Sequence, residues 1–314
     1  MVCPEHSMPC WQKIVYHMKP GKPVRIIYWG AWKRKNSPVD ESHKGSVVNM
    51  LEVYERNNVI CAEGLIESIG QKVFLYLVDG MLIDCGPEIL QEELLPFFRT
   101  YTFKQVILTH NHEDHTGNAA WIQNNMDKPI YIHPAGLAVC LVDGEYPAYR
   151  QFTWGGRKAF APGVLKSEIV SNTLEWKTLY TPGHADDHIA LYNQDRKLMF
   201  TGDLYVSSRT KVSMKTESIP QIMASIELVL QHDFEAIYCS HAGYLENGRE
   251  LLEKKLSYLA GISVKVQALM SEGKSAREIA DFLFPGDYPI IQFSEREWDT
   301  VHMVASFMKN PAFK

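Results

Sequence analysis

Three histidines and two acids occupy six consecutive positions in the segment LTHNHEDHTGN, residues 108–118. Alternate residues of an extended strand face one side, so His110 and His112 are expected to project together. Asp114 and His115 can turn toward the same space as the chain leaves the strand. Imidazole nitrogens and carboxylate oxygens are the usual ligands of hydrolytic zinc sites, and the motif lacks the cysteines of closed structural sites. The segment therefore predicts a catalytic metal site.

Three later strand-like runs end in the same types of side chain. They are His184 in TPGH, Asp203 in TGD and His241 in SHAG. A solvated histidine-rich turn would explain a single His-x-His pair, but it would not explain this recurrence. Seven candidate ligands are too many for one ion and suit two. We expect Glu113 to point away from both.

This set of motifs resembles the metallo-β-lactamase superfamily. The family pattern is an Asp after an early strand, then HxHxDH, then single His, Asp and His ligands. Here the early Asp is Asp84 in LIDCG, and the order holds over about residues 59–248. The resemblance implies a four-layer αββα sandwich with the site along the edge where the two sheets meet.

The resemblance also implies a division of the ligands between two divalent metal ions. The first ion would take His110, His112 and His184, and the second Asp114, His115 and His241. Asp203 would bridge them, while Asp84 would orient the cluster from outside, as metal-bound histidines generally require. Zinc is our first choice, with iron and manganese left open.

Two divalent ions would activate a shared water near neutral pH. Asp114 could hold that water and later pass a proton to the leaving group, as a general acid/base. The segment TPGHADDHIALY resembles the glyoxalase II-like and lactamase-like ribonuclease branch. We therefore expect a hydrolase of a small ester, thioester or lactone; the alternative is a nuclease or phosphodiesterase using the same metals.

Candidate substrate contacts follow Asp203 and precede His184. Tyr205 is a candidate donor to a substrate oxyanion, with a core position as the alternative. A polar loop could receive a carboxylate or phosphate, or be a solvated loop, through Arg209, Lys211 and Lys215. A second stretch could form a pocket wall: Trp154, Gly155, Gly156 and Arg157.

The elements that must position these residues begin near residue 59. Apolar runs such as VICAEGLIESI, KVFLYLVDG and QVILTH predict strands, and PEILQEELLPFFRTY predicts a helix, an order typical of an α/β layer structure. Helices follow from about residue 249, and Ser275 and Ser294 each begin a capping-box pattern. We expect a catalytic domain over 56–248 and a helical module over 249–314, which could cap the cleft or mediate a homodimer.

Residues 1–55 are punctuated by prolines and predict an irregular extension. This extension contains four side chains that could bind a metal in principle: Cys3, His6, Cys10 and His17. Their spacing matches no compact zinc motif, so a surface or packing role is favoured.

Composition sets wider limits. The chain has 314 residues, 46% hydrophobic and 22% charged, as in ordinary globular proteins. A net charge of -5 disfavours a nucleic-acid partner and favours a small-molecule substrate. Six scattered cysteines suggest buried thiols and a cytoplasmic location, and no apolar run is long enough to predict a membrane span.

Overall fold

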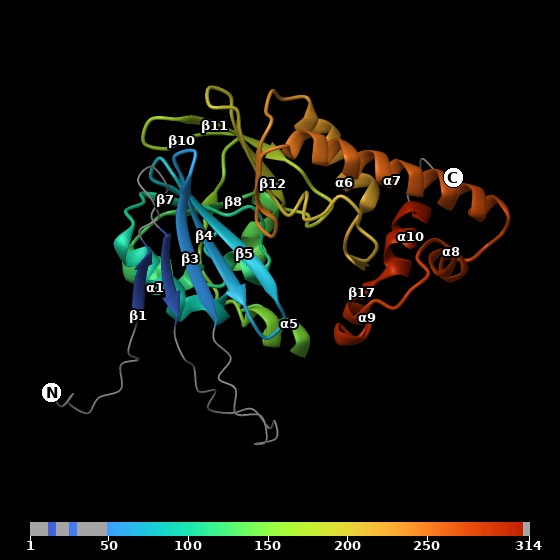
Figure 1. Cartoon of the computed structure of the whole chain (residues 1–314), viewed down its shortest axis with the longest axis horizontal. Helices are drawn as coiled ribbons and strands as arrows, with labels where there is room; N and C mark the ends of the chain where they lie inside the picture. The colour runs from blue at the N-terminus through green and yellow to red at the C-terminus, as the bar shows by residue number, and fades with distance from the viewer. Residues whose placement is uncertain (1–11, 17–24, 30–48, 310–314) are drawn as a thin grey trace, which may run out of the picture.

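The computed structural model describes residues 12–16, 25–29 and 49–309. Its first sheet has nine strands in sequence order, antiparallel from β1 to β6 and parallel from β6 to β9 (Figure 1). These strands are β1 (Gln12–Tyr16), β2 (Arg25–Trp29), β3 (Met50–Arg56), β4 (Val59–Ile66), β5 (Gln71–Val78), β6 (Met81–Ile83), β7 (Gln105–Ile107), β8 (Ile130–Ile132) and β9 (Gly163–Val164).

The second sheet has six strands in the order β10-β11-β12-β13-β15-β16. Only the β13–β15 pair is parallel among these described strands. The strands are β10 (Glu168–Val170), β11 (Glu175–Tyr180), β12 (Ile189–Asn193), β13 (Leu198–Gly202), β15 (Ile237–Cys239) and β16 (Gly243–Leu245). The ends of β7, β13 and β15 lead directly into metal-ligand motifs.

Side-chain alternation along the strands produces three core layers. On β5, Val73 and Leu75 belong to one hydrophobic cluster, whereas Phe74 and Tyr76 belong to another that also contains Phe200 of β13. Because successive strand residues face opposite sides, each sheet packs on both faces. The buried run VFLYLV of β5 is therefore continuously apolar or aromatic, because neither of its faces meets water.

Helices cover the outer face of each sheet. The cluster outside the first sheet includes residues of α1 (Gln91–Thr100) and α3 (Ala119–Met126). The cluster outside the second sheet includes residues of four helices: α6 (Ile219–Leu230), α7 (Gly248–Ser271), α8 (Ala276–Leu283) and α10 (Thr300–Met308). Figure 1 shows these two groups of helices on opposite sides of the sheets. The expected four-layer αββα sandwich with C-terminal helices is confirmed.

The N-terminal region differs from the irregular extension expected over residues 1–55. Segments β1, β2 and β3 are strands that add antiparallel neighbours to the edge of the first sheet at β4. The possible metal ligands Cys3, His6, Cys10 and His17 lie outside the described residues.

The C-terminal module contains one of the two expected capping boxes. Ser275 caps α8 reciprocally with Glu278, as predicted. The box expected at Ser294 is wrong, because α10 begins at Thr300 with Asp299 as its N-cap. Ser294 instead ends the short helix α9 (Pro289–Phe293).

A two-stranded sheet connects this module to the segment that follows Asp203. Its strands are β14 (Ser213–Met214) and β17 (Trp298–Asp299), paired antiparallel. Across the portion of the chain with described coordinates, none of the helices has both the length and the apolarity needed to cross a membrane.

Candidate metal centre

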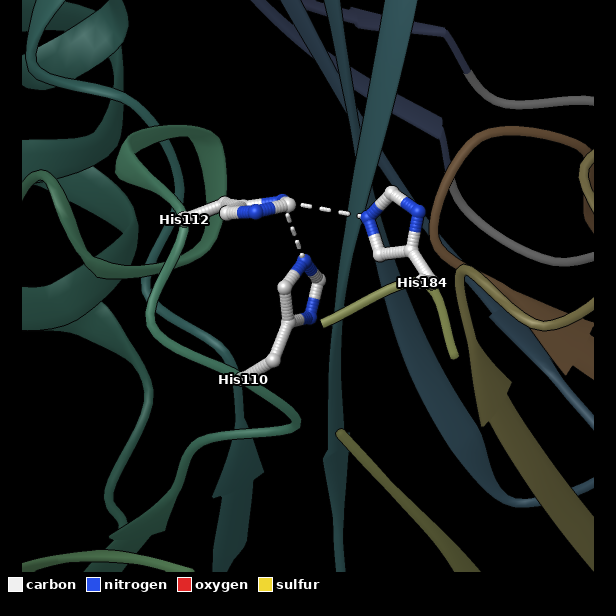
Figure 2. A group of neighbouring side chains, drawn as sticks. All are labelled: His110, His112 and His184. Atoms are coloured by element: carbon white, nitrogen blue, oxygen red, sulfur yellow. Dashed lines mark hydrogen bonds between the residues drawn. The ribbon is translucent and has the colours of Figure 1, made fainter. Parts of the chain in front are cut away.

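Three histidine rings converge on one point at the edge of the sandwich. Figure 2 shows His110 and His184 pointing toward His112 from two separate parts of the chain. The Nδ1 atom of His112 lies 3.0 Å from His110 Nε2 and 3.1 Å from His184 Nε2. His112 lies at the N-cap of α2 (Glu113–Thr116), which turns its ring out of the line of the preceding strand.

His110 and His112 are suited to act as neutral ligands. Burial, together with the neighbouring rings of His115 and His112, holds the pKa of His110 well below its usual value. Burial and the nearby His184 do the same to the pKa of His112. A neutral imidazole has one nitrogen lone pair free, and that form binds a metal.

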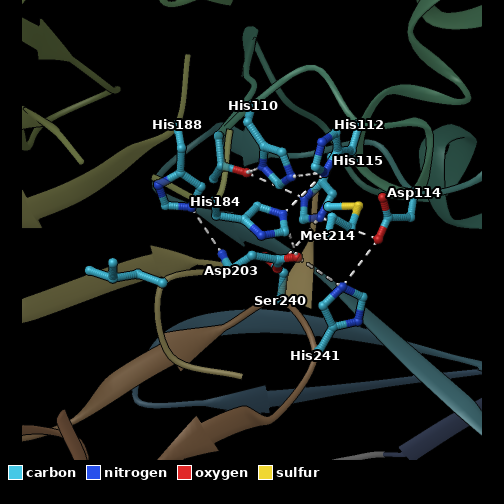
Figure 3. Close-up of polar contacts among 12 residues, drawn as sticks. His110, His112, Asp114, His115, His184, His188, Asp203, Met214, Ser240 and His241 are labelled. Atoms are coloured by element: carbon cyan, nitrogen blue, oxygen red, sulfur yellow. Dashed lines mark hydrogen bonds and ion pairs between the residues drawn. The ribbon is translucent and has the colours of Figure 1, made fainter. Parts of the chain in front are cut away.

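A second group lies beside the first and contains two acids and two histidines. Its members are Asp114, His115, Asp203 and His241, and each offers a ligand atom within 4.8 Å of the others (Figure 3). His241 Nε2 lies 3.1 Å from Asp114 Oδ2 and 3.2 Å from Asp203 Oδ2. Although burial opposes ionisation, His115 and His241 hold the pKa of both carboxyls well below the usual range. Both acids are therefore ionised, as metal ligands must be.

Asp203 connects the two groups. Its Oδ2 atom lies 3.4 Å from His184 Nε2 in the first group and 3.2 Å from His241 Nε2 in the second. Its Oδ1 atom and His115 Nε2 are buried and have no hydrogen-bond partner. These two atoms lie 3.5 Å from each other, beyond good hydrogen-bonding distance, and leaving a buried polar atom without a hydrogen bond costs about 1–3 kcal/mol. The donor set and these atoms fit metal ions.

Hydrogen bonds outside each group fix the orientation of the rings. Asp84 Oδ2 lies 2.7 Å from His115 Nδ1 and also accepts from the Thr109 hydroxyl. His241 Nδ1 donates to the Lys72 carbonyl at 2.8 Å. Each Nδ1 therefore donates away from the site, and each Nε2 faces it, where a metal ion would take the place of the Nε2 proton. Asp84 lies where the resemblance implied.

The partner of His184 was not predicted from the sequence. Glu217 Oε1 lies 2.6 Å from His184 Nδ1, and its Oε2 accepts from the Met214 backbone N–H at 2.9 Å. Glu217 lies on the segment before α6, where no local pattern distinguishes it from the neighbouring polar residues. Only the general need of a ligand histidine for an outer carboxylate could have suggested it.

The turn that presents Asp203 depends on two neighbouring features. The Asp203 backbone N–H donates to His188 Nε2 at 3.0 Å. Gly202 has φ +48, and a Cβ there would lie 2.6 Å from the same His188 nitrogen. A side chain at Gly202 would therefore displace the ring that holds the ligand loop.

Glu113 points away from both groups, and it is fully buried. Its two carboxylate oxygens accept from Arg150, at 2.6 Å from Nε and 2.5 Å from Nη2. Arg150 also donates to Glu297 of the C-terminal module at 3.1 Å. This arginine therefore joins the metal-ligand motif to the last part of the chain.

A cavity of about 790 Å³ opens onto both groups. Of the predicted substrate contacts, Trp154, Arg209 and Lys211 line it, whereas Lys215 does not. Tyr205 is buried in the core beside the second sheet and does not line the cavity, a placement that favours the packing role. Gly155, Gly156 and Arg157 do not line it either; Arg157 is buried and donates to two backbone carbonyls.

The chain belongs to the metallo-beta-lactamase superfamily, whose sequence profile matches residues 72–241. The fold agrees with that of a metallo-beta-lactamase family protein of Thermus thermophilus, at a TM-score of 0.60 and 18% identity, covering 80% of this chain and 92% of that one. Family and ligand groups together place the chain in the class of metal-dependent hydrolases.

Among curated proteins, the chain is similar to YflN of Bacillus subtilis, a probable metallo-hydrolase, at 27% identity over 42% of this chain and 55% of YflN. It is also similar to an atrochrysone carboxyl ACP thioesterase of Passalora fulva, at 26% identity over 48% of this chain and 39% of that protein. A hydroxyacylglutathione hydrolase of Francisella philomiragia is 23% identical over 41% of this chain and 42% of its own length. The chain thus spans just over half of YflN and about two fifths of each of the other two relatives.

Proposed function

We propose that the chain is a dinuclear metal-dependent hydrolase of esters, thioesters or lactones. The observation that supports this most strongly is the pair of adjoining ligand groups that share Asp203, with two buried polar atoms left without a hydrogen bond. Two divalent ions held there would supply a deprotonated water as nucleophile and polarise the attacked carbonyl. Zinc is the proposed metal, because the donors are histidine and carboxylate.

The residues of the chain supply orientation and proton transfer. Asp114 lines the cavity and takes part in the second ligand group, so its carboxylate can accept the proton of the attacking water. It can then return that proton to the leaving thiolate or alkoxide. In thioester hydrolysis, a C–O bond to the water oxygen forms as the C–S bond breaks.

Thioesters are the first candidate among these substrates. One relative is named as a thioesterase, and another hydrolyses an acylglutathione, which is a thioester. Small-molecule turnover also agrees with the acidic net charge of -5. A cytoplasmic location, where coenzyme thiols are reduced, is part of the proposal; the four described cysteines are buried and unpaired.

A metal analysis joined to a substrate panel tests the proposal. Freshly purified protein should contain two metal ions per chain, and a chelator should abolish hydrolysis. The panel contains a thioester, a lactone, a β-lactam, RNA and a bis-phosphodiester. Cleavage of RNA or the phosphodiester alone would replace this proposal with the nuclease alternative.

A further inference from the structure

The C-terminal module forms one wall of the catalytic cavity. Helix α9 contributes Ile290 and Phe293, and Tyr288 and Trp298 flank it. Metal-group residues such as Asp114 and His241 lie at another part of the same cavity. The Phe293 ring also contacts Tyr149 of α5 (Ala148–Trp154), with centroids 5.7 Å apart. The module is therefore placed where it must touch any ligand that fills the cavity.

The remaining wall is largely apolar. Ile69, Trp154 and Val206 contribute from the catalytic domain, and Leu259 contributes from α7. The cavity volume of about 790 Å³ is in the upper part of the range of roughly 300–1,000 Å³ found for pockets that bind drug-sized ligands. It far exceeds the volume of a simple lactone. An apolar cavity of this size favours a substrate with a bulky apolar body.

Four cationic side chains line the cavity, and two of them already have partners. Arg150 is paired with Glu113 and Glu297. Lys255 is buried and donates to the backbone carbonyls of Leu204 and Tyr205, at 2.8 and 2.6 Å. Neither is available to hold a substrate charge without losing a bond that it makes in this structure.

The other two cations, Arg209 and Lys211, have no ion-pair partner among the residues that the structure describes. Lys211 Nζ lies 5.8 Å from the centre of the Tyr288 ring, so the cations and the module wall are neighbours. Both residues are exposed at the cavity surface. They favour an anionic group on the ligand, because charge-assisted hydrogen bonds strengthen when a bound ligand displaces water from them.

From this arrangement we propose that the substrate carries a bulky apolar body and a separate carboxylate or phosphate. The body packs against Ile290 and Phe293, and the anion binds Arg209 and Lys211. The inference rests on the proposed thioester hydrolysis and names its specificity. The anion can belong to the acyl group or to the thiol, and substrates that differ only in its position distinguish these two sources.

The charge test uses matched thioesters. In the first pair the carboxylate is on the thiol: S-octanoyl-3-mercaptopropionate is compared with its methyl ester. In the second pair the carboxylate is at the end of the octanoyl chain, the thiol is neutral, and the acid is again compared with its methyl ester. We expect kcat/KM to favour one acid over its ester by about ten- to a hundred-fold. The double variant Arg209→Gln/Lys211→Gln should abolish that preference. Lys215→Gln, on the same segment but outside the cavity, should retain it.

The wall test uses α9. Wild-type protein should have a higher kcat/KM for an octanoyl thioester than for the butanoyl thioester of the same thiol. In Ile290→Ala and Phe293→Ala this ratio should fall several-fold, whereas Gln292→Ala on the same helix should keep the wild-type ratio. Circular dichroism and thermal unfolding check that the variants fold. A binding readout independent of catalysis is calorimetric titration of the non-hydrolysable S-octyl-3-mercaptopropionate and its methyl ester.

Each outcome has a distinct meaning. If wild-type protein hydrolyses neutral thioesters but shows no preference for either acid, the specificity inference fails while the proposed function stands. If a preference survives in Arg209→Gln/Lys211→Gln, the anion binds elsewhere, for example at the metals, and the inference is again overturned. If no thioester is hydrolysed and the thioether does not bind, the inference fails, and the proposed function fails with it if no ester or lactone is hydrolysed either.

Discussion

The metal centre and the cavity wall opposite it are built in different ways. The centre takes its ligands from segments that follow buried strands, and His110 and His115 are fully buried. The wall takes its residues from α9 and its flanks, where Phe293 is 42% exposed. The residues that would hold the metal ions therefore lie in the buried sandwich, whereas the proposed substrate wall lies on a more exposed helix. Helices α7, α8 and α10 of the same module nevertheless pack into the core beside the second sheet.

Removing the shared ligand should have the largest effect. Asp203→Ala takes away the one carboxylate that reaches both ligand groups, so both ions should bind more weakly. We expect hydrolysis to fall by at least about a thousand-fold and the metal content to drop. Kinetics and elemental analysis measure this. Near-normal activity with one remaining ion would show that the two groups do not work together.

Arg150 joins the two regions and should be next in effect. Arg150→Met leaves Glu113 buried and unpaired, which should cost about 3–5 kcal/mol of folding stability. Glu297→Gln removes only its more exposed partner and should cost much less. Urea unfolding compares them. Equal costs for the two variants would mean that Arg150 does not support the metal motif through Glu113.

Glu217 tests how strictly the centre is positioned. Glu217→Ala removes the carboxylate that holds His184 Nδ1 and should weaken metal binding by about 10–100-fold. Competition with a chelator measures this affinity. Glu227→Gln, an exposed position on α6, is the matched control and should bind as wild type does. Unchanged affinity in Glu217→Ala would show that His184 is held by packing alone.

Glu93 provides a small effect outside both regions. Burial raises the pKa of this α1 carboxyl to about 7 from its ordinary 4.5. The folded state therefore binds a proton more tightly, and the stability of the wild-type protein should fall as pH rises from about 4.5 to 7. Glu93→Gln should be more stable than wild type by about 1–2 kcal/mol at pH 8, with little difference at pH 4.5. A gain independent of pH would contradict this origin.

The convergence of the candidate ligands could be predicted from the sequence because residue type and position agree. His110, His184 and Asp203 each follow a strand-like apolar run, and the ends of strands in one layered fold meet at one edge. The four-layer fold was implied by the resemblance to the family, and buried runs such as VFLYLV agree with it because they are apolar or aromatic on both faces. Short strands such as β1 and β2 were missed, because five residues between prolines carry too little periodicity.

Residues that act through distant partners could not be predicted. Arg150 and Glu113 are 37 positions apart, and nothing local indicates that they pair. The failed capping box at Ser294 has the same cause. Its acid, Glu297, pairs with Arg150, and the Ser294 hydroxyl accepts from the Trp298 backbone N–H. A tertiary ion pair therefore outweighs a local motif worth about 1 kcal/mol.

Anomalous X-ray diffraction from crystals of the metal-loaded protein tests the central claim most directly. Two peaks are expected, one among His110, His112 and His184, and one among Asp114, His115 and His241. Asp203 should reach both. A single peak, or none within these two groups, would contradict the dinuclear centre.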